Sequence, residues 1–418
     1  MNVVIKPSPL SGQIKAIASK SYAHRLLMCA AVADKPCMLV CEELSDDIIA
    51  TANCLRVLGA KIEYADGKFN IEPIKTVNQC SSLDVGESGS TLRFILPFVC
   101  ALGAECDIHM HGRLPQRPLS PLYEELLAHG IVMSLKGKNP MHVSGHLKNT
   151  DFSIAGNVSS QFITGLMLAG AVSGAATVNI TSELQSASYV DITSECLKIF
   201  DVSVTNSVDI ISVSGKPVSP GTVDVQGDWS NAAFWLCAGA LGKEPLTVTG
   251  LKLNSSQGDR KILDVLKDFG VKMDVEDNRI CVHPSALSHV TVDAGDIPDL
   301  VPVISVLCAC ADGESRITNA ARLRIKESDR LKSVNEMLTA LGADVAELDD
   351  GLIIKGGKSL HGGRVDSFND HRIAMSAAVA SIACSGDVEI SGAEAVNKSY
   401  PNFYKDFSTL GGVVNEQI

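Results

Sequence analysis

Residues 19–33 read SKSYAHRLLMCAAVA: a first turn of small and polar residues precedes a run of apolar ones. The same pattern recurs along the chain, and successive starts lie 69 to 72 residues apart. An internal period of this length is typical of a fold assembled from repeated supersecondary units. The sequence therefore predicts six repeats, each containing a buried core helix. The five later helices begin near Ser88, Ser159, Asp228, Ile297 and Asn369.

A second pattern follows each start by 40–45 residues: an amphipathic helix ends in a turn residue, and an apolar, strand-like tail follows. Asp201 occupies this turn in the third repeat. Because two patterns keep one period, we expect all six repeats to share one structure. Glycine occupies the turn in the other repeats, at Gly59, Gly130, Gly270, Gly342 and Gly412.

Each repeat also contains short β-rich stretches, such as CMLVCEEL, CDIHMHG, ATVNITS and PLTVTGL. Helices that alternate with strands predict an α/β fold. The length of 418 residues is typical of two domains, and six repeats divide naturally into two sets of three. We expect an N-terminal domain over residues 20–226 and a C-terminal domain over residues 227–418 that includes the opening segment 1–19.

The composition is that of an ordinary globular protein, with 45% hydrophobic and 20% charged residues. The net charge of −12 disfavours nonspecific binding to nucleic acid or anionic lipid. No stretch reaches the ~20 apolar residues of a membrane helix, and the N-terminus has no apolar signal core. Thirteen scattered cysteines without a CxxC pair predict reduced, mostly buried thiols and no metal site. We expect a cytoplasmic monomer without nucleic-acid or membrane partners.

Basic side chains gather at the predicted helix starts and in the loops beside them. A helix N-terminus offers unpaired N–H groups and a favourable dipole, and arginine matches carboxylate and phosphate bidentately. If the helix starts of both domains face one cleft, that cleft suits anions even in an acidic protein. The basic residues are Lys20, Arg25, Arg93, Arg113, Arg117, Arg324, Lys326, Arg330, Arg372 and Lys398.

Two acids stand among these cations, Asp299 in DIPDLVP and Glu327 beside Lys326. Carboxyl groups in a cationic site suit general acid–base chemistry, so one hypothesis is a transferase that handles phosphate esters. A nucleotide-using enzyme is the poorer interpretation, because GxxxxGK[ST] and GxGxxG are both absent. A noncatalytic scaffold would not explain why acids and bases occur together at helix starts.

Nine motifs stand in order along nearly the whole chain: SKSYAHR, GESGSTLRF, QRPLSPL, SSQFITGLMLA, QGDWSNAAFWL, DIPDLVP, RIKESDRL, NDHRIAMSAA and KSYPNFYKDF. Together they resemble the EPSP synthase (3-phosphoshikimate 1-carboxyvinyltransferase) family of enolpyruvyl transferases. The resemblance implies two domains of three βαβαββ units each, with the active site in the cleft between them. It also implies transfer of the enolpyruvyl group of phosphoenolpyruvate to the 5-hydroxyl of shikimate 3-phosphate, with release of phosphate. No metal and no organic cofactor is implied.

The resemblance further implies roles for residues of this chain. Addition of the hydroxyl to C2 precedes elimination of phosphate; Asp299 would take the hydroxyl proton, and Glu327 would give a proton to C3 and later remove one. Lys20 would assist either transfer or steady the departing phosphate. Phosphoenolpyruvate would be held by Lys20, Gly89, Arg117, Arg330, Arg372 and Lys398. Shikimate 3-phosphate would be held by Lys20, Ser21, Arg25, Ser159, Ser160, Gln161, Ser186, Tyr189, Asp299 and Lys326.

The alternative is the sister family, UDP-N-acetylglucosamine enolpyruvyl transferase, which shares the fold. It typically carries a reactive cysteine five residues before the arginine of its RP loop. In this chain that position is Gly112, and the preceding cysteine, Cys106, lies eleven residues before Arg117.

Two positions depart from the EPSP synthase pattern. Many relatives have Asn where this chain has Glu87 and Arg322, so its finer substrate contacts are expected to differ.

Overall fold

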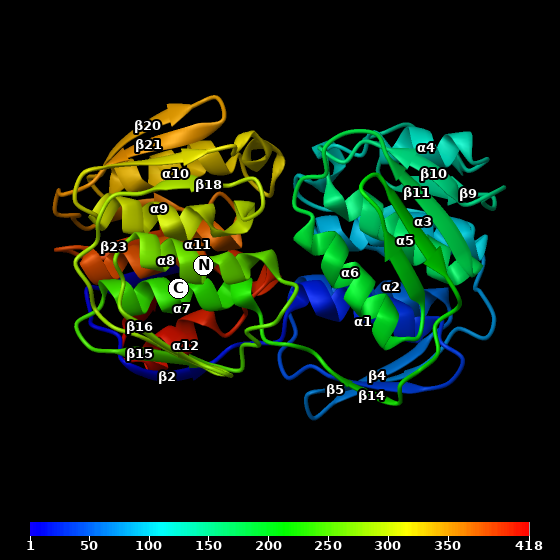
Figure 1. The fold of residues 1–418 in the computed structure, drawn as a ribbon, viewed down its shortest axis with the longest axis horizontal. Helices are drawn as coiled ribbons and strands as arrows, with labels where there is room; N and C mark the ends of the chain where they lie inside the picture. Colours follow the sequence, from blue (N-terminus) through cyan, green and yellow to red (C-terminus); the bar gives the residue numbers. More distant parts are fainter. Residues whose placement is uncertain (418) are drawn as a thin grey trace. The chain divides into compact units, whose positions relative to one another are not determined.

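The computed structural model describes residues 1–417 and divides into two compact units. Unit 1 comprises Met1–Ile17 together with the chain from Gln226 onward, and unit 2 comprises Ala18–Val225. The chain therefore passes from one unit to the other twice, after Ile17 and after Val225. Many of the helices and strands of both units are labelled in Figure 1.

Within residues 1–417 the strands form six four-stranded sheets, and the sheets repeat one arrangement. In the second repeat, β6 (Ser81–Asp84) runs parallel to β7 (Cys106–His109), and the hairpin of β8 (Val132–Met133) and β9 (Met141–Ser144) adds to β7 in the antiparallel sense. Helix α3 (Gly89–Leu102) connects β6 to β7, and α4 (Leu122–Ala128) connects β7 to β8. This order confirms the predicted α/β repeat of helices and strands.

Three sheets are completed by strands that are distant in sequence. In unit 2, β14 (Thr222–Asp224) pairs with β3 of the first repeat; in unit 1, β2 (Gly12–Lys15) pairs with β15 and β1 (Asn2–Lys6) pairs with β23. The remaining strands of unit 2 are β3 (Cys37–Val40), β4 (Lys61–Ala65), β5 (Lys68–Glu72), β10 (Asp151–Ile154), β11 (Ala175–Ile180), β12 (Ser203–Asn206) and β13 (Ile210–Ser214). Those of unit 1 are β15 (Leu246–Thr249), β16 (Met273–Glu276), β17 (Arg279–Val282), β18 (Thr291–Asp293), β19 (Glu314–Thr318), β20 (Asp344–Leu348), β21 (Gly351–Lys355), β22 (Gly363–Asp366), β23 (Val388–Ser391) and β24 (Val413–Gln417).

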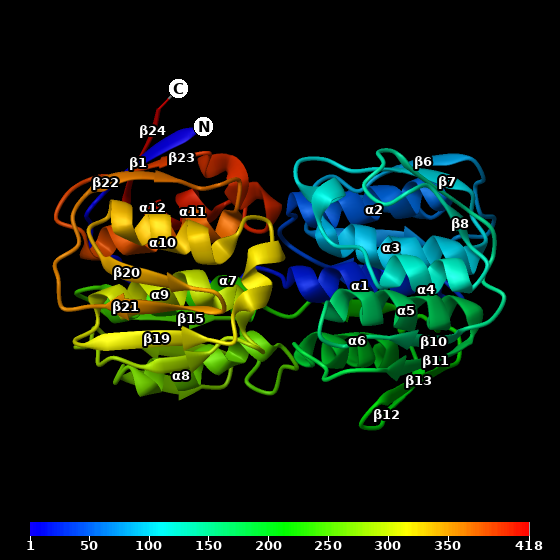
Figure 2. The ribbon, with the colours of Figure 1, turned by 90° about the horizontal axis from the view of Figure 1, so that it is seen from above.

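The first helix of each repeat lies in the interior of its unit (Figure 2). Such helices are apolar on nearly every side, which is the pattern expected of a helix that is surrounded by protein. In α9 every residue except Cys310 is buried. The interior helices are α1 (Lys20–Ala31), α3 and α5 (Ser160–Ser173) in unit 2, and α7 (Trp229–Leu241), α9 (Val301–Cys310) and α11 (His371–Ala380) in unit 1. The second helices are α2 (Asp46–Leu58), α4, α6 (Ser188–Ile199), α8 (Ile262–Asp268), α10 (Arg330–Ala340) and α12 (Phe403–Thr409).

The turn after the second helix adopts a left-handed backbone, as the glycine pattern predicts. Gly59 caps α2 with φ of 118°, and Asp201 takes the same conformation with φ of 58°. The prediction of Gly412 in the last repeat is wrong by one residue, because the left-handed residue is Gly411, with φ of 103°. Gly412 serves close packing instead, since a Cβ there would lie 2.1 Å from the ring of Phe407.

All thirteen cysteines lie within the described residues as unbonded thiols, and all but Cys80 and Cys310 are buried. This confirms the prediction of reduced, mostly buried thiols. None of the helices in residues 1–417 combines the length and the apolar character that a bilayer crossing requires.

Candidate active site

The first turns of the interior helices of unit 2 lie side by side, as hydrogen bonds between them show. Arg93 of α3 donates from Nη1 to Oε1 of Gln161 on α5 at 2.9 Å, and Gln161 donates from Nε2 to Oγ of Ser90 at 2.9 Å. Arg25 of α1 donates to Oγ1 of Thr164 on α5 at 3.1 Å. The structure therefore gathers these three helix starts at one end of the unit.

Gly89 opens α3 at a point where two guanidinium groups press against the backbone. A Cβ at this position would lie 2.5 Å from Nη1 of Arg93 and 2.8 Å from Nη1 of Arg117. Any larger residue would displace these cations, so the glycine is required for the close approach. Arg117 follows a short 3-10 turn, Leu114–Gln116, in the loop after β7. Two cations held at a helix N-terminus form a site suited to an anion.

Arg25 is the most deeply buried cation of unit 2, with 2% of its surface exposed. Its acceptors are neutral oxygens: Oγ1 of Thr193 at 2.8 Å, the carbonyl of Ser21 at 2.6 Å, Thr164 and the carbonyl of Tyr189. Burial lowers the pKa of Arg25 from 12.5 to about 10. The guanidinium therefore keeps a net positive charge that these neutral acceptors do not cancel.

The predicted serines lie at or just before the starts of α5 and α6, the helices of Thr164 and Tyr189 that Arg25 contacts. Ser159 caps α5 and accepts from the backbone N–H of Gln161 at 3.3 Å, and Ser160 follows it as a buried residue. Ser186 is buried with φ of 56°, a conformation that non-glycine residues adopt rarely and often at functional sites. Its carbonyl accepts from the N–H of Tyr189 at 3.2 Å. Arg25 therefore hydrogen-bonds to both helices whose starts carry these serines.

Lys20, the first residue of α1, forms an ion pair with Asp47 in the first turn of α2. Nζ of Lys20 lies 2.8 Å from Oδ2 of Asp47, and both side chains are less than one-fifth exposed. We use the name unit 2 cluster for the residues at the starts of α1, α3 and α5 together with Arg117. The cluster comprises Lys20, Arg25, Gly89, Arg93, Arg117, Ser160 and Gln161.

In unit 1 the corresponding charges converge on Arg330, whose side chain is 1% exposed at the start of α10. Its Nη1 donates to Oδ1 of Asp299 at 2.7 Å, its Nη2 donates to Oε2 of Glu327 at 2.7 Å, and its Nε donates to Oδ2 of Asp370 at 2.8 Å. Burial alone would lower the pKa of Arg330, but these three carboxylates raise it well above its ordinary value. Arg330 is therefore a permanent cation that orders three acids.

Asp299, in the short turn before α9, is in turn surrounded by cations. Nζ of Lys326 lies 3.3 Å from its Oδ1, and Nη2 of Arg372 lies 3.3 Å from its Oδ2. Burial would raise the pKa of Asp299, but Arg372, Lys326 and Arg330 outweigh burial and hold that pKa well below its ordinary value. In the state described here Asp299 is an ionised hydrogen-bond acceptor.

The remaining predicted residues are Arg372, at the start of α11, and Lys398, which contacts the residue before the cap of this helix. Asp370 caps this helix and accepts from the N–H of Arg372 at 3.0 Å, and Lys398 donates to the carbonyl of Asn369 at 2.7 Å. We call this second gathering the unit 1 cluster; it comprises Asp299, Lys326, Glu327, Arg330, Asp370 and Arg372.

Comparison with known proteins agrees with this chemistry. The sequence profile of the EPSP synthase (3-phosphoshikimate 1-carboxyvinyltransferase) family matches residues 4–407. The chain belongs to the EPSP synthase family. It is 42% identical over 419 residues to the 3-phosphoshikimate 1-carboxyvinyltransferase of Clostridium kluyveri, which covers 99% of this chain and 98% of that protein. The enzyme of Clostridium acetobutylicum is 41% identical over 427 residues, covering 100% of this chain and 99% of that protein.

A solved structure of the EPSP synthase of Acinetobacter baumannii has the same fold, with a TM-score of 0.83 at 26% identity over 99% of this chain and 100% of that one. The enolpyruvyl transferase fold predicted from the motifs is thereby confirmed. The activity of the chain is transfer of the enolpyruvyl group of phosphoenolpyruvate to shikimate 3-phosphate, in the pathway of aromatic amino acid synthesis.

Glu87 and Arg322, the two residues that depart from the pattern usual in the EPSP synthase family, each lie beside a specific neighbour. The Glu87 carboxylate lies against Gly112, since a Cβ on that glycine would meet the carboxylate atoms at 2.5–2.8 Å. Burial lowers the pKa of Lys326, and the positive charges of Arg330 and Arg322 add to this effect against the raising influence of Asp299. Arg322 therefore adds positive potential next to Lys326.

The structure offers no support for the thiol chemistry of the sister family. Gly112 has φ of 54°, a left-handed conformation that a cysteine side chain would strain. Cys106 is 1% exposed on β7, and burial raises the pKa of its thiol to about 12. A thiol of that pKa is protonated and unreactive near neutral pH.

Three residues of the site were not foreseen from the sequence: Asp47, Asp370 and Ser230, whose Oγ accepts from Nη2 of Arg372 at 2.7 Å. Each stands in the first turn or the cap of a helix, so its sequence signal is identical to that of an ordinary capping residue. Asp370 lies in the motif NDHR and Ser230 in the motif DWSN, and both motifs stand at predicted helix starts. That position is the only signal in the sequence that could have assigned the two residues to the site.

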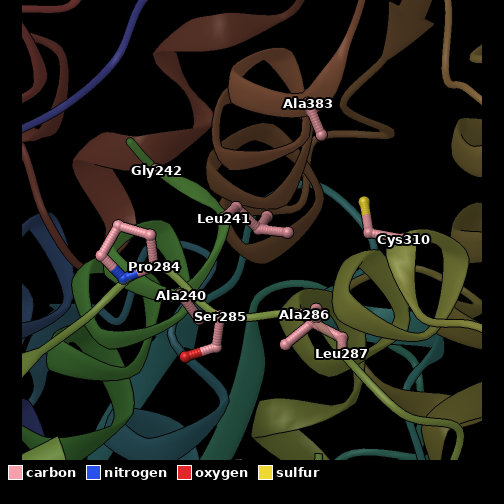
Figure 3. A pocket seen from close by; sticks show the side chains of 9 residues that line it. All are labelled: Ala240, Leu241, Gly242, Pro284, Ser285, Ala286, Leu287, Cys310 and Ala383. Carbon is pink, nitrogen blue, oxygen red and sulfur yellow. The ribbon is translucent and has the colours of Figure 1, made fainter. Parts of the chain in front are cut away.

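Two features of unit 1 lie away from its cluster. Among residues 1–417 one group has the composition of a metal site, Asp274, Cys281 and His283 on the β16–β17 hairpin, and Nε2 of His283 already lies 2.8 Å from Oδ2 of Asp274. A cavity of about 490 Å³ opens at the C-terminal ends of α7 and α9 (Figure 3). Its lining residues carry no charge, so it does not suit substrates with several negative charges.

Proposed function

We propose that the unit 1 and unit 2 clusters act on the same pair of substrates, one cluster contributed by each unit. The observation that supports this most strongly is that cations gather at helix starts in each unit, at α1 and α3 in unit 2 and at α10 and α11 in unit 1. Phosphoenolpyruvate and shikimate 3-phosphate each carry a phosphate and a carboxylate. Their charge matches clusters built on Arg25, Arg93 and Arg117 in unit 2 and on Lys326, Arg330 and Arg372 in unit 1.

In this proposal shikimate 3-phosphate is held mainly by unit 2. Ser159, Ser160 and Ser186 offer hydroxyl groups to its phosphate, and the positive charge of Arg25 favours its carboxylate. From unit 1, Lys326 faces the phosphate and Asp299 accepts from a ring hydroxyl. The remaining contacts come from Lys20, Ser21, Gln161 and Tyr189.

Phosphoenolpyruvate is held between arginines of both clusters. Gly89 gives the anion room to approach the N–H groups of α3 beside Arg117, and Arg330, Arg372 and Lys398 supply positive charge from unit 1. Fixed cations in a site that excludes water stabilise charge that develops in the transition state at little reorganisation cost.

The proton transfers follow from the charges around Asp299. Its pKa is well below its ordinary value because Arg372, Lys326 and Arg330 surround it, so Asp299 is a weak base in the empty enzyme. An anionic substrate bound to the same cations offsets their field and raises the pKa of Asp299. Binding of phosphoenolpyruvate therefore makes Asp299 a better acceptor for the proton of the attacking hydroxyl group.

Glu327 is the group that exchanges a proton with carbon. As the 5-hydroxyl oxygen bonds to C2 of phosphoenolpyruvate, C3 takes a proton from Glu327 and becomes a methyl group. In the second step the C2–O bond to phosphate breaks and the phosphate takes the proton that Asp299 accepted from the hydroxyl group. C3 returns a proton to Glu327, and the double bond forms again. Arg330 donates to Oε2 of Glu327 at 2.7 Å and keeps the carboxyl group oriented between the two steps. Lys20 steadies the departing phosphate.

Hydrogen exchange at C3 tests this assignment directly. In D2O with shikimate 3-phosphate present, the wild type should incorporate deuterium into unreacted phosphoenolpyruvate and should release phosphate. Glu327→Gln should lose both signals while it still binds both substrates. Glu347→Gln is the matched control, because Glu347 also pairs with an arginine of unit 1, Arg324 at 2.7 Å. Deuterium incorporation by Glu327→Gln at the wild-type rate would refute the role of Glu327.

The acceptor and the assembly are tested separately. Phosphate release from phosphoenolpyruvate should require shikimate 3-phosphate and should not occur with UDP-N-acetylglucosamine. We also propose that the enzyme acts as a cytoplasmic monomer, which predicts sedimentation at the chain mass of 44.2 kDa. A stable species of twice that mass would contradict the monomer.

A further inference from the structure

We propose that His24 is a positioning residue, which fixes the first turn of α3 for phosphoenolpyruvate through a chain of buried hydrogen bonds. The inference rests on the proposed binding of phosphoenolpyruvate at the start of α3, beside Gly89 and Arg117. His24 lies in the motif SKSYAHR and in the second turn of α1, yet it is not among the residues proposed to hold a substrate.

Four buried side chains from three helices form this chain. Nδ1 of His24 on α1 lies 2.7 Å from Oγ1 of Thr51 on α2, which in turn lies 2.8 Å from Oγ1 of Thr91 on α3. Oγ1 of Thr91 lies 2.8 Å from Oγ of Ser88, the cap of α3. Each of the four residues is 1% exposed, so the protein and not the solvent supplies their hydrogen-bond partners.

The far end of the chain lies at the proposed anion site. Oγ of Ser88 also accepts from the backbone N–H of Thr91 at 3.2 Å, and this cap orients the first turn of α3. Gly89 follows Ser88 directly, and a Cβ on Gly89 would lie 2.8 Å from Nη1 of Arg117. The N–H groups that this turn offers to an anion are therefore placed by the cap at which the chain ends.

The number of available hydrogens sets the direction of the chain. Thr91 has one hydroxyl hydrogen, which it directs to Ser88, and its oxygen also lies 3.3 Å from the carbonyl oxygen of Asp47, a group that can only accept. Because that hydrogen is used at this end, Thr51 donates to Thr91 and accepts from His24. His24 is then the first donor of the chain, with its proton on Nδ1.

The other ring nitrogen of His24 supports this assignment. Nε2 is buried and has no hydrogen-bond partner within residues 1–417, and the ring of Phe94 packs at right angles to the imidazole. A proton on Nε2 would be a buried donor without an acceptor, which proteins rarely contain. Burial and the positive charges of Lys20 and Arg25 lower the pKa of His24 well below its ordinary value, so the ring is neutral and carries one proton.

The test compares two substitutions of His24 in steady-state kinetics. His24→Leu removes the donor and should raise KM for phosphoenolpyruvate about three- to tenfold, the effect of one lost neutral hydrogen bond. Both kcat and KM for shikimate 3-phosphate should stay within about twofold of wild type. His24→Asn should restore the wild-type KM, because its amide nitrogen can take the place of Nδ1 and donate to Thr51. Equal rises for both substrates, or a rise that asparagine does not reverse, would overturn the inference.

His129→Leu is the matched control for a general loss of stability. His129 is also a buried histidine of unit 2, and its ring nitrogens hydrogen-bond to the backbone carbonyls of Glu125 and Asp151. This variant should lower the urea midpoint of unfolding but leave KM for both substrates unchanged. A rise in KM for phosphoenolpyruvate equal to that of His24→Leu would show that loosening of the unit is sufficient, and it would overturn the inference.

Thr51→Val provides a second route if His24→Leu folds poorly. It removes the middle of the chain at nearly constant volume and should raise KM for phosphoenolpyruvate within the same range. The double variant His24→Leu, Thr51→Val should show no further rise, because both changes break one path. Additive effects of the two changes would refute a role for His24 through this chain.

Nuclear magnetic resonance reads the tautomer without any assay of activity. Long-range correlation of ring hydrogens with ring nitrogens should show a protonated Nδ1 and a bare Nε2 for the histidine whose signals disappear in His24→Asn. A protonated Nε2 on this ring would overturn the direction of the chain and with it the proposed role.

Arg117→Ala separates failure of this inference from failure of the proposed function. If Arg117→Ala raises KM for phosphoenolpyruvate and neither His24→Leu nor Thr51→Val does, only the role of His24 is refuted. If Arg117→Ala leaves that KM unchanged, both the proposed binding of phosphoenolpyruvate at α3 and the role of His24 are refuted.

Discussion

The burial of Arg330 predicts a large and pH-dependent stability effect. Arg330→Met replaces a guanidinium that is 1% exposed with an apolar side chain of similar length, and it leaves Asp299, Glu327 and Asp370 without their shared cation. Breaking a buried ion pair by removing one partner costs about 3–5 kcal/mol. We expect the free energy of unfolding of unit 1 to fall by this amount at pH 7.5.

The sign of the pH effect follows from the acids. In the wild type, burial would raise the pKa of Asp370, but Arg330 outweighs burial and holds that pKa below its ordinary value. The ionised Asp370 carboxyl therefore contributes stability at every pH above the pKa that this group has in the unfolded chain. That contribution is lost as the pH falls through the lower pKa of the folded state. Without Arg330, burial raises the pKa of Asp370, and protonation relieves the buried charge as the pH falls. The loss of stability in Arg330→Met should therefore be smaller at pH 5 than at pH 7.5.

Tryptophan fluorescence is the suitable assay, because both tryptophans of the chain, Trp229 and Trp235, lie buried in α7 of unit 1. Urea titrations followed by this signal report on the unit that contains Arg330. Arg316→Met is the matched control, since Arg316 pairs with Glu314 on the surface of the same unit and such pairs contribute about 0–1 kcal/mol. An Arg330→Met effect as small as that of Arg316→Met, or one that does not change between pH 5 and 7.5, would refute the reasoning.

Three further predictions concern activity. Lys20→Met should lower kcat by about 10²–10³-fold, the loss expected when one preorganised charge is removed, while circular dichroism stays unchanged; near-normal turnover would remove Lys20 from the mechanism. Arg117→Ala should raise KM for phosphoenolpyruvate by about 10–100-fold, as expected for a lost charge-assisted hydrogen bond, with a much smaller effect on shikimate 3-phosphate; equal losses would contradict the assignment. Iodoacetamide at pH 7.5 should modify the exposed Cys80 without inactivating the enzyme, because burial holds the pKa of the Cys106 thiol at about 12; inactivation traced to Cys106 by mass spectrometry would contradict this.

The sequence predicted the repeat well because each of its signals is local. An apolar run, a polar first turn and a left-handed residue some 40–45 positions later all lie within one repeat, and the structure reproduces them at Gly59 and at Asp201. The error at Gly412 has an equally local cause. Two adjacent glycines fit the turn, and only the packing of Phe407 against the second one distinguishes them.

The interactions within the candidate site could not be predicted, because they join residues that are far apart in sequence. Arg330 contacts Asp370 from 40 positions away, and Arg372 contacts Ser230 from 142 positions away. The sequence pattern places these charged residues at helix starts, but it does not predict which carboxylate pairs with which cation.

Small-angle scattering tests most directly whether both units hold the same substrates. The Glu327→Gln variant, which should bind without turnover, is measured alone, with shikimate 3-phosphate, and with shikimate 3-phosphate and phosphoenolpyruvate together. We predict that the radius of gyration decreases when both substrates are present, because anions bound by cations of both units draw the units together. Identical scattering in all three samples, at substrate concentrations shown by calorimetry to saturate the protein, would contradict a shared site.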